Sequence, residues 1–312
     1  MVTVKPDLSL NIGKLKLKNP IITASGTFGY ADEYEEFMSI QNIGAIVTKG
    51  ITLDPRDGNP QPRIAEVKSG MLNSIGLENV GICSFIEHKL PILKERNINF
   101  ILNIAGFSLE EYAQLAVICE KSEIPAIELN VSCPNVKAGC LEFGKDQETL
   151  YRLVSSVREV YSNTLIVKLS PNVSNPIEIA LAVQKAGADA VSAINTVKGM
   201  QVNPIINNGK LEHSYIKGGY SGPAIKPIAL SYIHEIKQVL DIPIIGMGGI
   251  SNVDDVLEFI AVGSVAVQIG TANFTNPCIS EQLAKDLENV LMQHNIMSLQ
   301  DLIEGNKNAN NR

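Results

Sequence analysis

The chain has 312 residues, of which 45% are hydrophobic and 19% are charged, a balance typical of a globular protein with a sizeable core. Its formal net charge of −7 argues against binding nucleic acid, because surfaces that neutralise phosphates are basic. No stretch approaches the ~18 apolar residues that a membrane-spanning helix needs, and the N-terminus lacks a secretory signal pattern. The five cysteines form no C-x-x-C pair, which disfavours a zinc site and fits a reducing compartment. We expect a cytoplasmic protein without membrane or nucleic-acid partners.

The first predicted element is an N-terminal hairpin within residues 1–19. Residues 8–17, with the sequence LSLNIGKLKL, alternate around a glycine and precede the first buried strand. We expect this hairpin to plug the floor of the fold that follows.

Eight short apolar runs rich in β-branched residues come next, separated by amphipathic stretches of helical length. Near-continuous apolar runs are typical of parallel strands that are buried on both faces. Eight such repeats predict an α/β fold, a (β/α)8 TIM barrel, as one domain over residues 1–312. A doubly wound sheet split over two domains is the alternative, but no Pro/Gly/Ser-rich linker divides the chain. The predicted strands are Ile21–Ala24, Ala45–Lys49, Phe100–Ile104, Ala126–Val131, Leu165–Leu169, Ala190–Ile194, Ile244–Met247 and Ala266–Ile269.

Helices are predicted between these strands, together with two long insertions. Ser108 and Glu111 are spaced as a capping box at the start of one helix, and Gly187 and Gly263 are placed to end two others. The insertions, residues 51–80 and 197–224, are rich in Gly, Pro and Asn and follow strands two and six. They are expected to be long loops at the C-terminal mouth of the barrel, where active sites are built. The polar residues 305–312 predict a disordered tail. The predicted helices are Leu109–Lys121, Glu148–Tyr161, Ile177–Lys185 and Val253–Ile260.

Polar residues and glycines follow almost every predicted strand, where they would face a ligand at the mouth. Glycines after strands seven and eight match the usual phosphate site of TIM barrels, because glycine lets backbone N–H groups approach an anion. Tight turns are the alternative explanation for these glycines. None of the four histidines follows a strand, which argues against a histidine-dependent hydrolase or metal site. The residues at the strand ends include Ser25, Lys49, Gly50, Asn103, Asn130, Lys168, Asn195, Thr196, Gly248, Gly249, Gly270 and Thr271.

Two lysines and one cysteine are candidates for chemistry. Lys168 lies in a run that otherwise predicts a buried strand, and a buried ammonium needs an anionic partner, which is either a structural ion pair or a bound anionic cofactor. Lys49 raises the same question. Cys133 ends a strand beside Pro134, where a neighbouring lysine would lower the pKa of its thiol and make it a usable base. Cys83 and Cys119 lie in helical patterns and are expected to be small buried hydrophobes.

The segment Asn130–Gly144 resembles the catalytic loop of the class 1B branch of the class 1 dihydroorotate dehydrogenases. The resemblance covers nearly the whole chain, although Cys140 stands where a second glycine is expected. The other segments that carry it are Ala24–Gly29, Thr48–Gly50, Asn73–Asn79, Ile194–Thr196, Tyr220–Ala224 and Gly246–Ile250.

This resemblance implies oxidation of (S)-dihydroorotate to orotate in pyrimidine synthesis, with FMN at the barrel mouth. Cys133 would take the proton from C5 of the substrate while the flavin accepts hydride from C6. The residues implied to bind substrate are Lys49, Asn73, Ser74, Ile75, Gly76, Leu77, Asn130, Asn195 and Thr196. Those implied to bind FMN are Ser25, Lys49, Gly50, Asn103, Asn130, Lys168, Ile194, Gly222, Gly248, Gly249, Gly270 and Thr271.

The class 1B branch also implies a partner subunit with FAD and a 2Fe–2S cluster that passes electrons to NAD, in a heterotetramer with a homodimeric core. Val136 and Lys137, followed by Phe143 and Gly144, favour this branch over the fumarate-using class 1A homodimer. A related flavin barrel that acts on uracil-type rings, and a phosphate-binding barrel without redox chemistry, are the remaining alternatives.

Overall fold

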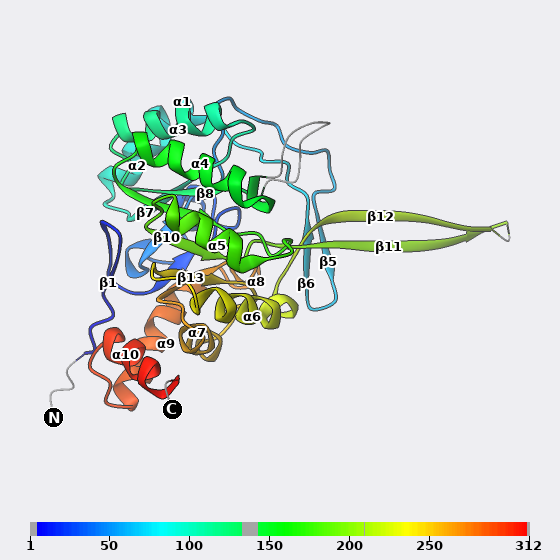
Figure 1. Cartoon of the computed structure of the whole chain (residues 1–312). Coiled ribbons are helices and arrows are strands. Elements are labelled where there is room, and N and C mark those ends of the chain that lie inside the picture. The colour runs from blue at the N-terminus through cyan, green and yellow to red at the C-terminus, as the bar shows by residue number, and fades with distance from the viewer. Residues whose placement is uncertain (1–4, 133–142, 209, 311–312) are drawn as a thin grey trace.

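Eight parallel strands close into a barrel at the centre of the protein (Figure 1). The computed structural model describes residues 5–132, 143–208 and 210–310, with side chains up to Gly305 in the last helix. Each strand pairs with the next along the chain, and the last returns to the first. This confirms the predicted TIM barrel. Its strands are β3 (Ile21–Thr23), β4 (Ala45–Val47), β7 (Phe100–Ile104), β8 (Ala126–Asn130), β9 (Thr164–Lys168), β10 (Ala190–Ala193), β13 (Ile244–Met247) and β14 (Ala266–Ile269).

Amphipathic helices surround the barrel and bury their apolar faces against it. Between β3 and β4 the connection contains only the 3-10 turns η1 (Asp32–Tyr34) and η2 (Ile40–Asn42), so the first repeat has no full helix. The helices are α1 (Ile82–Ser84), the π-helix η3 (Phe85–Lys89), α2 (Leu90–Glu95), α3 (Leu109–Lys121), α4 (Gln147–Val160), α5 (Pro176–Lys185), α6 (Lys226–Lys237), α7 (Val253–Ala261), α8 (Ala272–Thr275), α9 (Ile279–Gln293) and α10 (Leu299–Asn310). The 3-10 turns η4 (Phe143–Lys145) and η5 (Pro223–Ile225) precede α4 and α6. Among the helices of the described chain, none is both long and apolar enough to cross a membrane.

The predicted helix boundaries follow from local chemistry. The Ser108 side chain accepts a hydrogen bond from the backbone N–H of Glu111 at 3.2 Å and caps α3. The Glu111 carboxylate accepts from the backbone N–H of Phe107 at 2.7 Å instead of that of Ser108, so only half of the predicted capping box forms. Gly187 and Gly263, after α5 and α7, have φ angles of 92° and 119°, a region that glycine enters without steric cost.

The C-terminal residues differ from the prediction. Residues 305–310, expected to be disordered, continue helix α10. The helix is anchored upstream, because Leu299 is buried and both Leu302 and Ile303 pack on the core. Once the first turns are fixed by packing, polar residues can extend a helix at little further cost.

The N-terminal hairpin, β1 (Leu10–Ile12) and β2 (Leu15–Leu17), plugs the barrel floor as predicted. Ile12, Leu15 and Leu17 form one buried cluster with inward-facing residues from all eight strands. The Thr164 hydroxyl, at the start of β9, accepts hydrogen bonds from the backbone N–H groups of Lys14 and Leu15, both at 3.0 Å. The barrel residues of the cluster are Ile22, Ala45, Val47, Ile101, Ala126, Ile166, Ala190, Ile245 and Ala266.

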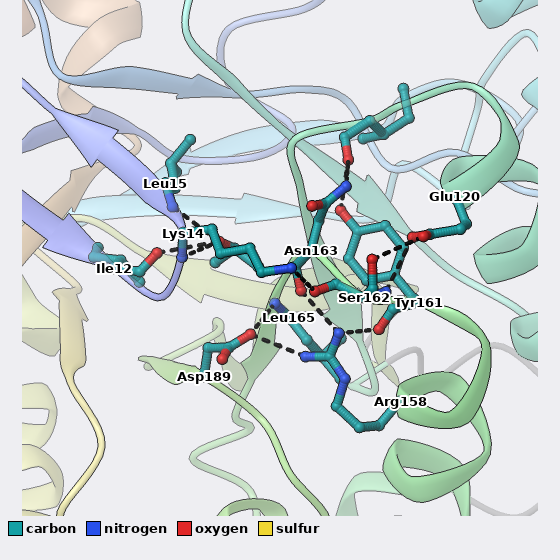
Figure 2. A network of polar contacts seen from close by, with 12 residues as sticks. Ile12, Lys14, Leu15, Glu120, Arg158, Tyr161, Ser162, Asn163, Leu165 and Asp189 are labelled. Carbon is teal, nitrogen blue, oxygen red and sulfur yellow. Dashed lines mark hydrogen bonds and ion pairs between the residues drawn. The ribbon is translucent and has the colours of Figure 1, made fainter.

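Polar contacts tie the turn of this hairpin to the neighbouring loops. Figure 2 shows Lys14 reaching the backbone of Ser162, where its ammonium donates a hydrogen bond of 2.7 Å. Beside it, Arg158 and Asp189 form an ion pair at 3.0 Å, and Asp189 also accepts from the backbone N–H of Leu165. The plug is therefore held by both packing and hydrogen bonds.

The two insertions meet at the mouth as one antiparallel sheet with the order β11-β12-β6-β5. Its strands are β5 (Ile64–Val67), β6 (Gly70–Asn73), β11 (Val197–Asn207) and β12 (Lys210–Ser221). Glycine-rich sequence there indicated loops, but a Cβ atom on Gly218 or Gly219 would overlap Asn73 or Thr196, so these glycines allow close strand packing. Beyond the sheet, β11 and β12 continue as a two-stranded ribbon that projects far from the barrel (Figure 1).

Candidate active site

A cavity of about 660 Å³, here called the central cavity, opens at the carboxyl ends of the barrel strands. TIM-barrel enzymes build their active sites at this end. The structure brings all twelve residues predicted to bind the cofactor to its wall: Ser25, Lys49, Gly50, Asn103, Asn130, Lys168, Ile194, Gly222, Gly248, Gly249, Gly270 and Thr271. The sequence therefore located the residues of this wall, although their roles stay predictions.

A second hollow of about 490 Å³, here called the side hollow, shares wall residues with the central cavity. Its lining contains eight residues predicted to bind substrate: Asn73, Ser74, Ile75, Gly76, Leu77, Asn130, Asn195 and Thr196. The ninth, Lys49, lines the central cavity instead. Lys145, Lys198 and Lys217 also line the side hollow, whereas none of its described lining residues is acidic. The hollow is thus suited to an anionic ligand in an otherwise acidic protein.

The inward face of the barrel changes from apolar at the floor to polar at the mouth. Successive inward positions on a strand are two residues apart. Two residues beyond floor residues Ile101, Ala126, Ile166, Ala190 and Ala266 come Asn103, Glu128, Lys168, Ser192 and Gln268, all buried. The same step from Val47 leads to Lys49, which lines the central cavity. The strands thus place a polar layer between the apolar floor and the cavity.

Lys168, the last residue of β9, belongs to this layer and is only 4% exposed. Its ammonium donates a hydrogen bond of 3.2 Å to the hydroxyl of Ser25. Burial lowers the pKa of Lys168, and the negative charge of Glu128 opposes that shift. A buried lysine beside a cavity suits an anionic ligand, because such a ligand would offset the cost of burying the ammonium.

Lys49 is held at the cavity wall by an ion pair. Its ammonium lies 3.1 Å from the carboxylate of Glu78, which also contacts Arg63 at 3.0 Å. Hydrogen bonding to Lys49 lowers the pKa of Glu78, so this carboxylate stays ionised near neutral pH. The sequence analysis left open whether Lys49 has a structural partner, and the structure shows one. Because Lys49 remains partly exposed, its pairing with Glu78 is compatible with a further contact to a ligand.

Asparagine side chains line the boundary between the two cavities. The Asn195 amide donates to the Asn130 side chain at 3.4 Å, and its oxygen accepts from the backbone N–H of Thr196 at 2.7 Å. Asn73 donates to the backbone carbonyl of Gly219 at 3.1 Å. Amides offer both donors and acceptors, so this boundary matches a flat ring with alternating N–H and C=O groups.

Glycines are required where the segment after β12 approaches the segment after β13 at the barrel mouth. Gly222 and Gly249 have φ angles of 107° and 79°. A Cβ atom on Gly249 would lie 2.9 Å from the backbone oxygen of Gly222, closer than packing allows. These residues thus leave backbone exposed at the cavity wall, as close approach of an anion requires.

Cys133, the predicted base, and Cys140 lie outside the described residues. Ser132, immediately before Cys133, lines the side hollow, and its buried hydroxyl has no partner among the described residues. The helical cysteines differ from each other. Cys119 is buried as predicted, and burial raises the pKa of its thiol to about 12. The expectation that Cys83 is buried is wrong, because α1 turns Ile82 to the core and leaves Cys83 exposed.

Sequence reasoning missed three residues of the polar layer: Glu128, Ser192 and Gln268. The Glu128 side chain is fully buried and accepts hydrogen bonds from the other two and from Asn103. The available signal was a polar or charged residue within an otherwise apolar strand, as it was for Lys168. Only Lys168 was interpreted as functional.

Fold and site together define a TIM-barrel protein with a cavity at the mouth that contains a buried lysine, and with an amide-lined hollow beside it. The family model described as "Dihydroorotate dehydrogenase" matches residues 7–291. The chain belongs to the dihydroorotate dehydrogenase family.

Curated relatives match the chain over nearly its full length. A protein of Geotalea uraniireducens (strain Rf4) is 48% identical, with 96% of this chain and 98% of the relative covered. One from Bacteroides thetaiotaomicron is 47% identical, covering 95% and 98%, and one from Trichlorobacter lovleyi is 46% identical, covering 96% and 98%. All three are named "Dihydroorotate dehydrogenase B (NAD(+)), catalytic subunit". These names confirm the class 1B resemblance rather than the class 1A alternative.

Proposed function

We propose that this chain is an FMN-dependent dihydroorotate dehydrogenase that oxidises (S)-dihydroorotate to orotate in de novo pyrimidine (UMP) biosynthesis. The observation that carries the proposal is that the residues predicted to bind FMN and those predicted to bind substrate line two adjoining cavities. All twelve predicted FMN residues line the central cavity, and eight of the nine predicted substrate residues line the adjoining side hollow. Family membership and the names of the relatives support the same reaction.

The residues of the central cavity fit FMN. The side-chain oxygens of Asn103 and Gln268 are buried without hydrogen-bond partners in the described structure, as expected of acceptors that await a ligand. Lys168 supplies a buried positive charge, and Gly222 and Gly249 allow close approach of a phosphate. When bound, FMN would supply a two-electron acceptor.

Substrate would bind in the side hollow with its ring against the asparagine boundary. Asn73, Asn130 and Asn195 would pair with its amide edges, while Lys198 and Lys217 draw its carboxylate into the hollow. Cys133 would remove the proton from C5. Its role rests on sequence resemblance, and the position of Ser132 at the hollow supports it.

We further propose that electrons leave through a partner subunit that carries FAD and a 2Fe–2S cluster and reduces NAD. The name "catalytic subunit" of the relatives supports a separate partner. A heterotetramer with a homodimeric core, located in the cytoplasm, is the assembly that the class 1B resemblance implies.

The projecting ribbon offers a surface for contact with another chain. Alternate residues of β11 and their partners on β12 share one face, because Val202 pairs with Tyr215 and Ile206 with Leu211. These four side chains are exposed, Ile206 to 81%. An exposed apolar strip of this kind usually marks an interaction surface.

The reaction is tested by product formation. FMN-loaded protein with an artificial dye acceptor should convert dihydroorotate to orotate, and dihydrouracil should react far more slowly. A preference for dihydrouracil would support the uracil-ring alternative. With the partner subunit added, NAD should replace the dye; fumarate as the better acceptor would contradict the proposed branch.

A further inference from the structure

Glu128 lies at the centre of the polar layer between the barrel floor and the central cavity. Its carboxylate is fully buried on β8 and does not line the cavity. Asn103 donates its amide to Oε1 at 2.7 Å, and Gln268 donates its amide to Oε2 at 2.7 Å. The Ser192 hydroxyl donates to Oε2, also at 2.7 Å. Four different strands thus meet at one carboxylate.

This arrangement determines which way the two amides point. The Glu128 oxygens are the acceptors in all three of these hydrogen bonds. Asn103 and Gln268 therefore turn their NH2 groups toward Glu128, which leaves their carbonyl oxygens at the other end. Both residues line the central cavity, and both carbonyl oxygens are buried without a partner in the described residues. The pocket wall consequently presents acceptors rather than donors at these two positions.

We propose that Glu128 is a positioning residue that fixes the amides of Asn103 and Gln268 so that their carbonyl oxygens accept a hydrogen bond from a ring N–H of FMN. The inference rests on the proposed FMN site. The isoalloxazine ring carries both an N–H group and carbonyl oxygens on its pyrimidine edge. Carbonyl oxygens fixed at the wall therefore recognise the ring N–H. An amide free to rotate could instead turn its NH2 group toward the ring N–H, and two donors cannot form a hydrogen bond with each other.

The electrostatics of the layer support a carboxylate at this position. Lys168 reaches the same layer from β9, and the charge of Glu128 counteracts the effect of burial on the pKa of this lysine. A neutral residue at position 128 would leave Lys168 without this compensation. Glu128 therefore acts on the cavity through groups that do line it.

A double-mutant cycle on FMN affinity tests the inference, with affinity read from quenching of FMN fluorescence by the apo-protein. In Glu128→Gln the amides of Asn103 and Gln268 are no longer held with their NH2 groups toward residue 128. We expect this substitution to raise the Kd for FMN at least tenfold, which corresponds to about 1.4 kcal/mol. In a background of Asn103→Ala with Gln268→Met, the same substitution should raise it less than threefold, because both amides that Glu128 orients are gone and only its effect on Lys168 remains. Glu111→Gln, a matched change at the start of α3, should leave the Kd unchanged.

The outcomes separate this inference from the proposed function. Equal effects of Glu128→Gln in the two backgrounds, or no effect in the wild-type background, would overturn the positioning role. Failure of the wild-type chain to bind FMN would instead refute the proposed cofactor. If Glu128→Gln does not fold, as judged by circular dichroism, the Kd of Gln268→Met for FMN tests the inference instead. This variant keeps Glu128 but removes one acceptor, so an unchanged Kd would overturn the inference.

Discussion

Replacing Lys168 by methionine tests whether its buried charge serves an anionic cofactor. Methionine keeps most of the length of the side chain and removes the ammonium. Lys168 is 4% exposed, and within the described part of the chain its ammonium donates a hydrogen bond only to the neutral hydroxyl of Ser25. No carboxylate forms a close ion pair with it in the described residues, so much of its desolvation cost remains for a ligand to offset.

The expected loss of affinity follows from this burial. Two unit charges about 4 Å apart interact by about 4 kcal/mol at an effective dielectric constant of about 20, which is an upper bound because both groups lose water. Hydrogen bonds to charged groups contribute about 1.5–3 kcal/mol net. Lys168→Met should therefore raise the Kd for FMN by roughly 10-fold to 150-fold.

The assay is equilibrium binding of FMN to the apo-protein, with chemical unfolding of each variant as a check on folding. Lys89→Met removes the same charge from a residue that pairs with Asp32 at 2.7 Å and lines neither cavity. This control should bind FMN as the wild type does. If both variants bind FMN equally well, Lys168 has only a structural role.

The pKa of Lys168 gives this prediction a pH dependence. Burial lowers its pKa below that of the unfolded chain, so the unfolded chain binds more protons. Stability of the apo-protein should then rise with pH between the lowered folded pKa and about 10.4, and Lys168→Met should abolish that contribution. FMN affinity should fall over the same range, because the lysine loses the charge that attracts the anion. Parallel pH profiles of wild type and variant would contradict this reasoning.

Three further substitutions probe other parts of the account. Thr164→Val should lower the free energy of unfolding by about 2–4 kcal/mol in urea denaturation, because two backbone N–H groups of the plug hairpin lose their acceptor; an unchanged midpoint would mean that the hydroxyl does not secure the plug. Lys198→Gln with Lys217→Gln should raise the KM for dihydroorotate several-fold at low ionic strength, and persistence of the difference at ~1 M salt would argue against steering by charge. Cys133→Ser should retain FMN but lose most turnover near neutral pH, since an alcohol is a weaker base than a thiolate; full turnover at pH 7 would remove Cys133 from the mechanism.

The barrel and the wall of its cavity were predictable because their signals are local. Buried parallel strands appear as apolar runs, and polar residues after such runs meet at one end of a barrel whatever the details of packing. Lys168 stood out because a charge interrupted an apolar strand, and the structure places it where that reasoning expected.

Features that depend on long-range contacts could not be predicted in the same way. Gly218 and Gly219 resembled loop residues, but they allow β12 to pack closely against residues more than twenty positions away. Glu128 and Gln268 lie 140 residues apart, on β8 and β14, and their meeting follows only from barrel closure. The exposure of Cys83 depends on which side of a short helix faces the core.

The most direct test of the proposed reaction is an anaerobic visible spectrum of the FMN-loaded chain before and after one equivalent of dihydroorotate. The account predicts that the flavin band near ~450 nm is lost and that orotate is formed. A flavin band that persists after addition of substrate would contradict the proposed reaction while leaving the cofactor site intact. Absence of a flavin band after reconstitution would contradict the FMN site itself.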